Sequence, residues 1–156
     1  MLEAGQRAPE FSLPALDGST RTSSEILAAG PVLLALFKVS CPVCQYALPF
    51  LERLHQAADG LLQFFAVSQD DARATRGFLD EFGIRFPALL DEEAKGYALS
   101  NAFNISYVPS LFLVEADGTI SWATHGFSRA ELERLGKRVG ASPFLPGEKV
   151  PDWKAG

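Results

Sequence analysis

An apolar run that ends in two cysteines reads PVLLALFKVSCPVC over residues 31–44. Cys41 and Cys44 are the only cysteines of the chain, and two residues separate them. The apolar run predicts a strand that is covered on both faces, and the helical spacing of apolar residues after Cys41 predicts a helix that begins there. Because the N-terminus of a helix favours a thiolate over a thiol, this pattern is typical of reversible thiol–disulfide chemistry.

Further helices and strands are predicted before and after this unit. The turn Asp17-Gly18 predicts a β-hairpin over residues 11–22, and Ser23 or Ser24 should cap a short helix after it. Pro49 should kink the helix at 41–58. Further elements are expected as strands at 61–68 and 86–90, a helix from Asp70 or Asp71 to Gly83, a helix at about 92–103, a hairpin over 110–115 and 119–124, and a helix at about 128–139 with a capping box of Ser128 and Glu131. This order predicts an α/β domain.

Length and composition are those of one compact domain with a real core. The chain has 156 residues, of which 47% are hydrophobic, so we expect a single domain over 1–156 whose Pro/Gly-rich tail, 140–156, packs on it. A net charge of −5 without a basic run argues against binding to nucleic acid or to an anionic membrane. No apolar run is long enough to span a bilayer, and no signal peptide is visible at the start. A cytoplasmic location is therefore the expectation, or a periplasmic one if a leader has been trimmed.

Several motifs follow one another in a recognisable order. They are the segment from Gly5 to Pro14 with Asp17-Gly18, the Cys41/Cys44 pair after a buried strand, Pro49 eight residues after Cys41, Val108-Pro109-Ser110 before an apolar strand, the turn Asp117-Gly118, and Gly126-Phe127. Together they resemble the thioredoxin superfamily, and within it the TlpA/ResA-type thiol–disulfide oxidoreductases and the AhpC/TSA redoxins. The likeness covers residues 5 to about 139.

The resemblance implies a thioredoxin-like fold, with a central mixed β-sheet flanked by helices, an N-terminal β-hairpin and an inserted helix and strand. It implies that Cys41 attacks a substrate disulfide and that Cys44 resolves the mixed disulfide. Pro109 would be cis and would place the backbone of Val108 beside Cys41, to pair with an extended substrate. An apolar rim for the substrate would consist of Pro42, Val43 and Phe127. No cofactor beyond the redox-active disulfide is expected, and the partners would be protein or small-molecule thiols and disulfides and an electron donor.

Two departures from the family pattern concern the environment of the cysteines. Ser40 stands where a tryptophan is usual, and Ala35 and Ala47 stand at the two positions where members carry a buried acid that accepts a proton. Lys38 and His125 are the candidates for tuning the thiols. The alternative interpretations are a lysine whose amino group reaches solvent and a histidine at a strand edge without a chemical role.

Other functions fit the pattern less well. Structural cysteines or half of a zinc site are one alternative, but zinc needs four ligands, and only His55 and His125 remain, without finger-like spacing. A thiol peroxidase is the second, but its Pro-x-x-x-Thr/Ser-x-x-Cys pattern matches neither cysteine. A non-enzymatic binder or a thiolate metal carrier is the third. The sequence therefore favours a thiol–disulfide oxidoreductase, with peroxide reduction as the alternative.

Overall fold

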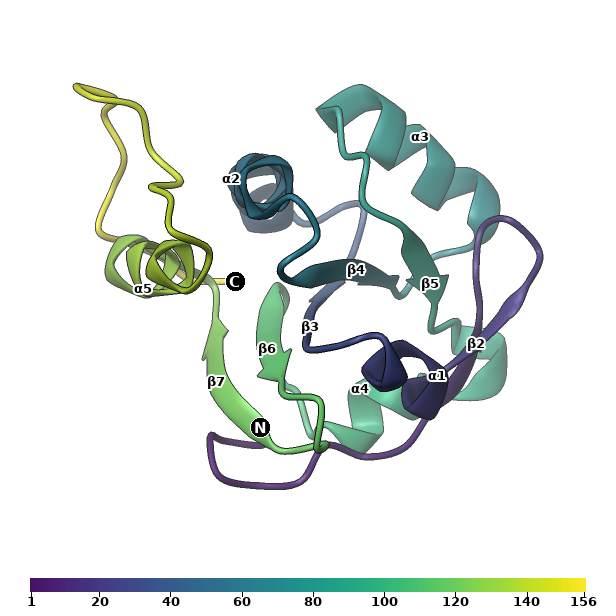
Figure 1. Cartoon of the computed structure of the whole chain (residues 1–156). Helices are drawn as coiled ribbons and strands as arrows, with labels where there is room; N and C mark the ends of the chain where they lie inside the picture. The colour runs from purple at the N-terminus through teal and green to yellow at the C-terminus, as the bar shows by residue number, and fades with distance from the viewer.

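A five-stranded mixed sheet forms the centre of the computed structural model, which describes residues 1–156 (Figure 1). Its strands are β3 (Val32–Phe37), β4 (Gln63–Ser68), β5 (Ala88–Leu90), β6 (Ser110–Val114) and β7 (Ile120–His125), in the order β5-β4-β3-β6-β7. The strands β3, β4 and β5 run parallel, whereas β6 is antiparallel to both β3 and β7. The predicted mixed central sheet is therefore confirmed.

Strand β3 lies in the middle of the sheet, and all six of its residues are buried. Its side chains alternate between two apolar clusters, because successive residues of a strand point to opposite faces. Leu33, Ala35 and Phe37 join the cluster that contains Cys44, whereas Val32, Leu34 and Leu36 join the other. This double burial explains why the predicted strand reads as a continuous apolar run.

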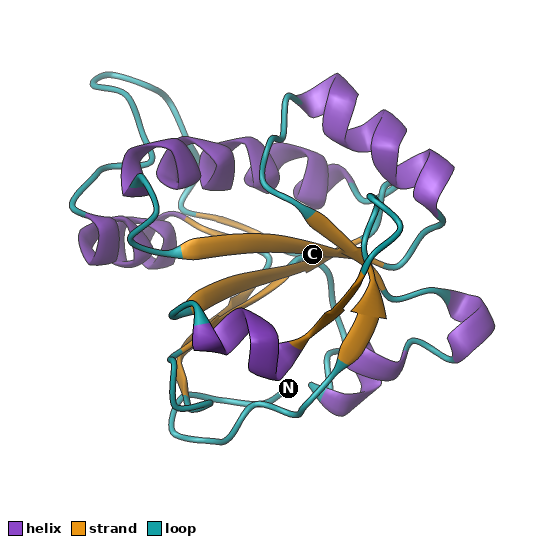
Figure 2. Cartoon of the chain, turned by 45° about the vertical axis from the view of Figure 1, so that its right-hand side comes forward, coloured by secondary structure: helices purple, strands orange, loops and turns teal.

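Helices cover both faces of the sheet, which makes three layers (Figure 2). The helices are α1 (Ser23–Ala28), α2 (Pro42–Ala58), α3 (Ala72–Phe82), α4 (Ala98–Ala102) and α5 (Arg129–Val139), with a 3₁₀ turn η1 at Glu93–Lys95. Residues of α2, α3 and α5 pack in the cluster that contains Cys44, and residues of α1 and α4 pack in the opposite one. None of these helices combines the length and the apolar character needed to cross a membrane.

The helix caps agree only in part with the predicted ones. Thr22, and not Ser23 or Ser24, caps α1, because its hydroxyl accepts from the backbone N–H of Glu25 at 3.2 Å. The predicted capping box of α5 is half formed. Ser128 accepts from the backbone N–H of Glu131 at 3.2 Å, but the Glu131 carboxylate accepts from the indole N–H of Trp122 at 2.7 Å.

The prediction of one continuous helix at about 92–103 is wrong, because the structure divides this segment into η1 and α4. Gly96 and Tyr97 interrupt it with φ values of 71° and 49°, in the left-handed region. The carboxylate of Asp91, which is 2% exposed, then accepts from the backbone N–H groups of Leu99 and Ser100 at 2.9 and 2.8 Å. Asp91, which lies outside the helix, thus provides hydrogen-bond acceptors for two free backbone N–H groups in the first turn of α4.

Two small sheets complete the fold. The N-terminal hairpin is confirmed as β1 (Ser12–Pro14) paired with β2 (Thr20–Thr22). The second sheet pairs β8 (Phe127–Ser128) with β9 (Trp153–Lys154) in antiparallel fashion. A bidentate ion pair between Arg53 of α2 and Glu148, with distances of 2.7 and 3.0 Å, fixes the long loop that leads to β9. The residues after α5 therefore fold back along α2 and end beside β8.

An ion pair between Glu115 and Arg138 should make the stability depend on pH. The Arg138 guanidinium donates to both carboxylate oxygens at 2.7 Å, and these hydrogen bonds lower the pKa of Glu115 from 4.5 to about 2. A depressed folded-state pKa gives stability that is present above pH 4.5 and is lost as the pH falls through about 2.

The measurement is urea unfolding of the wild type and of Glu115→Gln at several pH values. Because the Arg138 side chain is 41% exposed, we expect the substitution to lower the free energy of unfolding by only about 1 kcal/mol at neutral pH. This difference should shrink toward zero near pH 2. Glu133→Gln, which removes a longer ion pair at 3.3 Å on the same helix, is the control. An equal Glu115→Gln effect at neutral and acid pH would contradict the prediction.

Candidate active site

The two cysteines lie where β3 ends and α2 begins. Cys41 is the N-cap residue of α2, with φ −82° and ψ 113°, and its Sγ accepts from the backbone N–H of Cys44 at 3.1 Å. Pro42 occupies the first helical position, where its lack of an N–H costs nothing. Sulfur at an N-cap faces the free N–H groups of the first turn, and these groups stabilise negative charge on it. The predicted thiol position at a helix N-terminus is confirmed.

The two thiols differ in exposure. Cys44 is fully buried, whereas Cys41 is partly exposed, and both are free thiols in this structure. Burial, and then the hydrogen bond to the Cys41 side chain, raise the pKa of Cys44 well above its ordinary value. Cys44 therefore stays protonated at neutral pH while Cys41 is available to solvent and to a substrate. The geometry therefore gives Cys41 the outer position and Cys44 the inner one, which suits the attacking and resolving roles that the family resemblance implies.

The loop between β3 and Cys41 is held by two side chains that sequence reasoning missed. Asp70 accepts from the backbone N–H of Val39 at 2.8 Å, and the amide of Gln45 donates to the Val39 carbonyl at 2.9 Å. Of the two predicted cap candidates, Asp71 caps α3, with a distance of 2.8 Å to the N–H of Ala74. Asp70 is therefore a support for the loop that carries Cys41.

The Val108-Pro109 peptide bond is cis, as predicted, and it lies beside Cys41. The Cys41 thiol donates to the Val108 carbonyl oxygen at 3.5 Å. The Pro109 carbonyl accepts from the N–H of Gly126 at 2.8 Å, so the cis-proline loop is tied to the end of β7. Backbone groups of Val108 are thus placed next to the sulfur, at the edge where an extended chain could pair.

Of the three predicted rim residues, two remain available. Pro42 is exposed and Val43 is half-buried. Phe127 is fully buried, so the prediction that its side chain lines an apolar rim is wrong. Its ring packs against Tyr46 and Phe50, with centroids 5.0 and 5.7 Å apart, inside an aromatic cluster that also includes Phe144. What Phe127 presents toward the surface is its backbone, which pairs with Lys154.

The two tuning candidates have different surroundings. His125, on β7 opposite Ser110, has two aromatic neighbours. The Tyr107 ring is stacked on it with a centroid distance of 5.6 Å, and the Trp153 ring is perpendicular to it with a centroid distance of 5.5 Å. Its Nδ1 is buried without a hydrogen-bond partner. Lys38 lines a hollow of about 260 Å³ together with Tyr107 and Val108. Neither the Lys38 nor the His125 side chain forms a hydrogen bond with a cysteine sulfur, so the role of these two residues in tuning the thiols stays a prediction.

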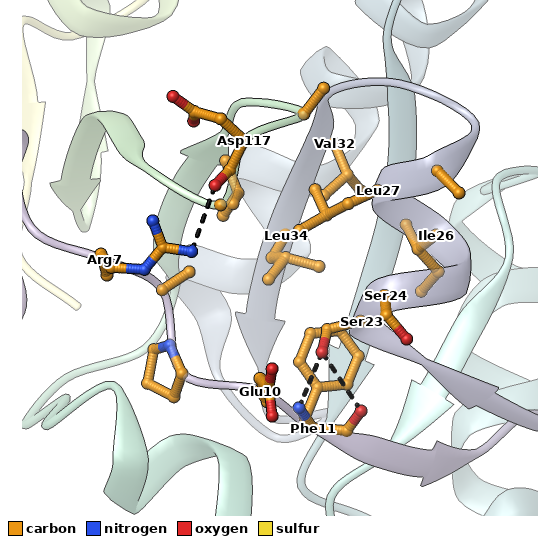
Figure 3. A pocket seen from close by; sticks show the side chains of 16 residues that line it. Arg7, Glu10, Phe11, Ser23, Ser24, Ile26, Leu27, Val32, Leu34 and Asp117 are labelled. Atoms are coloured by element: carbon orange, nitrogen blue, oxygen red, sulfur yellow. Dashed lines mark hydrogen bonds between the residues drawn. The ribbon is translucent and has the colours of Figure 1, made fainter.

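A cavity of about 320 Å³ lies away from the cysteines, on the opposite face of the sheet (Figure 3). Arg7 is one of its lining residues, and the Arg7 guanidinium donates to the Asp117 carbonyl oxygen at 3.2 Å (Figure 3). Its floor includes Leu34 and Ile26, which belong to the apolar cluster that does not contain Cys44. The sheet separates this cavity from both thiols, so it is not part of the candidate active site.

Comparison with known proteins gives a family and a fold. The AhpC/TSA family model matches residues 4–123. The thioredoxin-like protein YneN of Bacillus subtilis is 27% identical over 123 residues, which cover 76% of this chain and 69% of that protein. The thiol-disulfide oxidoreductase ResA of Halalkalibacterium halodurans is 28% identical over 122 residues, which cover 77% and 67%. The thioredoxin domain of a thiol-disulfide oxidoreductase from Bacteroides vulgatus superposes with a TM-score of 0.77 at 18% identity, covering 88% of this chain and 98% of that domain. The expected thioredoxin-like fold is confirmed.

Proposed function

The chain belongs to the AhpC/TSA family, and on this premise we propose that it is a thiol–disulfide oxidoreductase in which Cys41 attacks and Cys44 resolves. The likeness to YneN and ResA supports this chemistry. The observation that carries the assignment of roles is the asymmetry of the pair. Cys41 is partly exposed and its sulfur accepts a helix N–H at 3.1 Å, whereas Cys44 is fully buried one turn further along.

The first step is attack on the substrate disulfide. The Cys41 thiolate displaces one sulfur of the substrate, so the substrate S–S bond breaks and a mixed disulfide forms on Cys41. The displaced sulfur leaves as a thiolate and takes a proton from solvent. Backbone N–H groups at the start of α2, including that of Cys44, stabilise the attacking sulfur before the step.

The second step is resolution by Cys44. After losing its proton, Cys44 displaces the substrate sulfur from Cys41, so the mixed disulfide breaks and the Cys41–Cys44 disulfide forms. The substrate has then gained two electrons and the protein has lost two. A thiol reductant must return them before the next cycle, and the reverse sequence would oxidise a substrate dithiol.

Loss of the Cys44 proton is the demanding part of this cycle. The two positions where family members carry a buried acid hold Ala35 and Ala47, each only 1% exposed, and they place methyl groups there. Burial keeps the pKa of Cys44 high. Hydroxide from solvent is therefore the base that we propose for this proton.

The test counts the electrons that the purified, fully reduced protein gives to a small disulfide. Excess 5,5′-dithiobis(2-nitrobenzoate) should release two thionitrobenzoate ions per chain and leave an intramolecular disulfide between Cys41 and Cys44. With dithiothreitol as reductant, the protein should then reduce insulin catalytically. Faster turnover of hydrogen peroxide than of any disulfide would instead identify a thiol peroxidase, and stoichiometric thiol loss without an internal disulfide would remove the role given to Cys44.

A further inference from the structure

Residues 152–156, here called the docked segment, contain β9, the outer strand of a small sheet beside the active site. Within it, β9 pairs with β8, so that Lys154 faces Phe127 and Trp153 faces Ser128. The Asp152 carbonyl accepts from the N–H of Arg129 at 3.0 Å and extends this pairing. In Figure 1 the end of the chain lies beside the start of β6, which follows the cis-proline. The docked segment therefore runs toward the cysteines.

Two close approaches show how tightly the backbones meet. At Gly126, with φ +69°, a Cβ would collide with the Lys154 carbonyl oxygen and the Trp153 ring. At Gly156, a Cβ would collide with the carbonyl of Val108. The same Val108 oxygen lies 3.5 Å from the Cys41 sulfur. The docked segment thus covers the backbone group that a substrate chain would use beside the attacking sulfur.

The contacts that hold the docked segment are few. Trp153 places its ring against His125 at 5.5 Å but is still 48% exposed. The Lys154 ammonium lies 5.3 Å from the centre of the Tyr46 ring. The strand pairing covers only two residues. Segments with so few buried contacts open at low free-energy cost, so this one can leave while the rest of the domain stays folded.

We infer that the docked segment occupies the groove for extended polypeptide substrates and selects substrates by size; this inference rests on the proposed function. Polypeptides bind to an exposed strand edge by backbone pairing, and here that edge consists of β8 and Val108. A small disulfide needs access only to Cys41, which is partly exposed. A protein disulfide must wait until the docked segment leaves, so its apparent affinity is reduced by the fraction of molecules that are open.

The experiment compares insulin with the small disulfide 5,5′-dithiobis(2-nitrobenzoate) as substrates of full-length variants. Gly156→Leu and Trp153→Ala should each release the docked segment. We expect the ratio of kcat/KM for insulin to kcat/KM for the small disulfide to rise about three- to tenfold in both. Leu145→Ala is the control, since Leu145 is likewise an exposed apolar residue of the tail, at 61% exposure, but lies outside the docked segment. Its ratio should equal that of the wild type.

A second readout needs no enzymatic turnover. The alkylation rate of Cys41 is measured with iodoacetamide and with a polyethylene-glycol maleimide, and the rate with the large reagent relative to the small one should rise in the same two variants. An unchanged ratio in both variants, in both readouts, would overturn the inference and leave the proposed function intact. If no variant reduces any disulfide, the proposed function fails, and the alkylation ratio alone decides whether the docked segment restricts access to Cys41.

Discussion

Cys44→Ser should stop turnover and accumulate a mixed disulfide on Cys41, whereas Cys41→Ser should stop turnover without forming any adduct. In the first variant the exposed sulfur still attacks, but no buried thiol displaces the substrate. Only external thiol can then release it. An intramolecular displacement at favourable geometry corresponds to an effective concentration far above millimolar, so we expect turnover with millimolar dithiothreitol to fall on the order of a thousandfold or more.

Intact-mass measurement after mixing each reduced variant with a disulfide substrate distinguishes the two roles. Cys44→Ser should gain the mass of one substrate half, removable by dithiothreitol, and Cys41→Ser should keep its mass. Circular dichroism of both variants controls for folding, which is a necessary check because Cys44 is fully buried. Adduct formation in Cys41→Ser, with none in Cys44→Ser, would reverse the assignment of the two sulfurs.

The rate of resolution should rise about tenfold per pH unit between pH 6 and pH 8. Burial, together with the hydrogen bond to Cys41, raises the pKa of Cys44. Below a raised pKa the thiolate is a small fraction of the total, and this fraction increases tenfold with each unit of pH. Since the thiolate is the nucleophile, the rate of the second step should follow it.

Stopped-flow mixing of the reduced protein with excess 5,5′-dithiobis(2-nitrobenzoate) separates the two steps. The first thionitrobenzoate ion reports attack by Cys41, and the second reports resolution by Cys44. The Cys44→Ser variant, which should show only the first phase, identifies the signals. A second phase that does not change with pH would show that a group of the protein takes the Cys44 proton, against the proposal that hydroxide from solvent does so.

The unit that consists of β3, Cys41 and the start of α2 could be predicted from sequence, because the physical causes of its structure lie in neighbouring residues. Because β3 is covered on both faces, it appears in the sequence as a continuous apolar run. Cys41 caps α2 with its own side chain, so the start of this helix is also visible in the local sequence. The cis-proline came from the family resemblance, since an isolated Pro109 gives no local indication of its isomer. These features place the cysteines after the carboxyl end of β3, the central strand of the sheet.

Contacts between distant residues could not be predicted in this way. The Asp70 carboxylate reaches Val39, which is 31 residues away, and nothing near Asp70 in the sequence distinguishes it from the neighbouring helix cap Asp71. The pairing of β9 involves only two residues in a Pro/Gly-rich segment, too few for any period to be visible. The family resemblance predicts Phe127 in the apolar rim of the site, but the aromatic residues of α2 bury its ring.

The difference between the two sulfurs is measured most directly by alkylating the native, reduced protein with iodoacetamide near neutral pH. Fragment ions that separate position 41 from position 44 give the rate at each thiol. We expect Cys41 to react on the order of a hundredfold faster than Cys44, and the difference to vanish in denaturant. Equal rates in the native protein, or faster reaction at Cys44, would contradict the account of an exposed attacking sulfur and a buried resolving one.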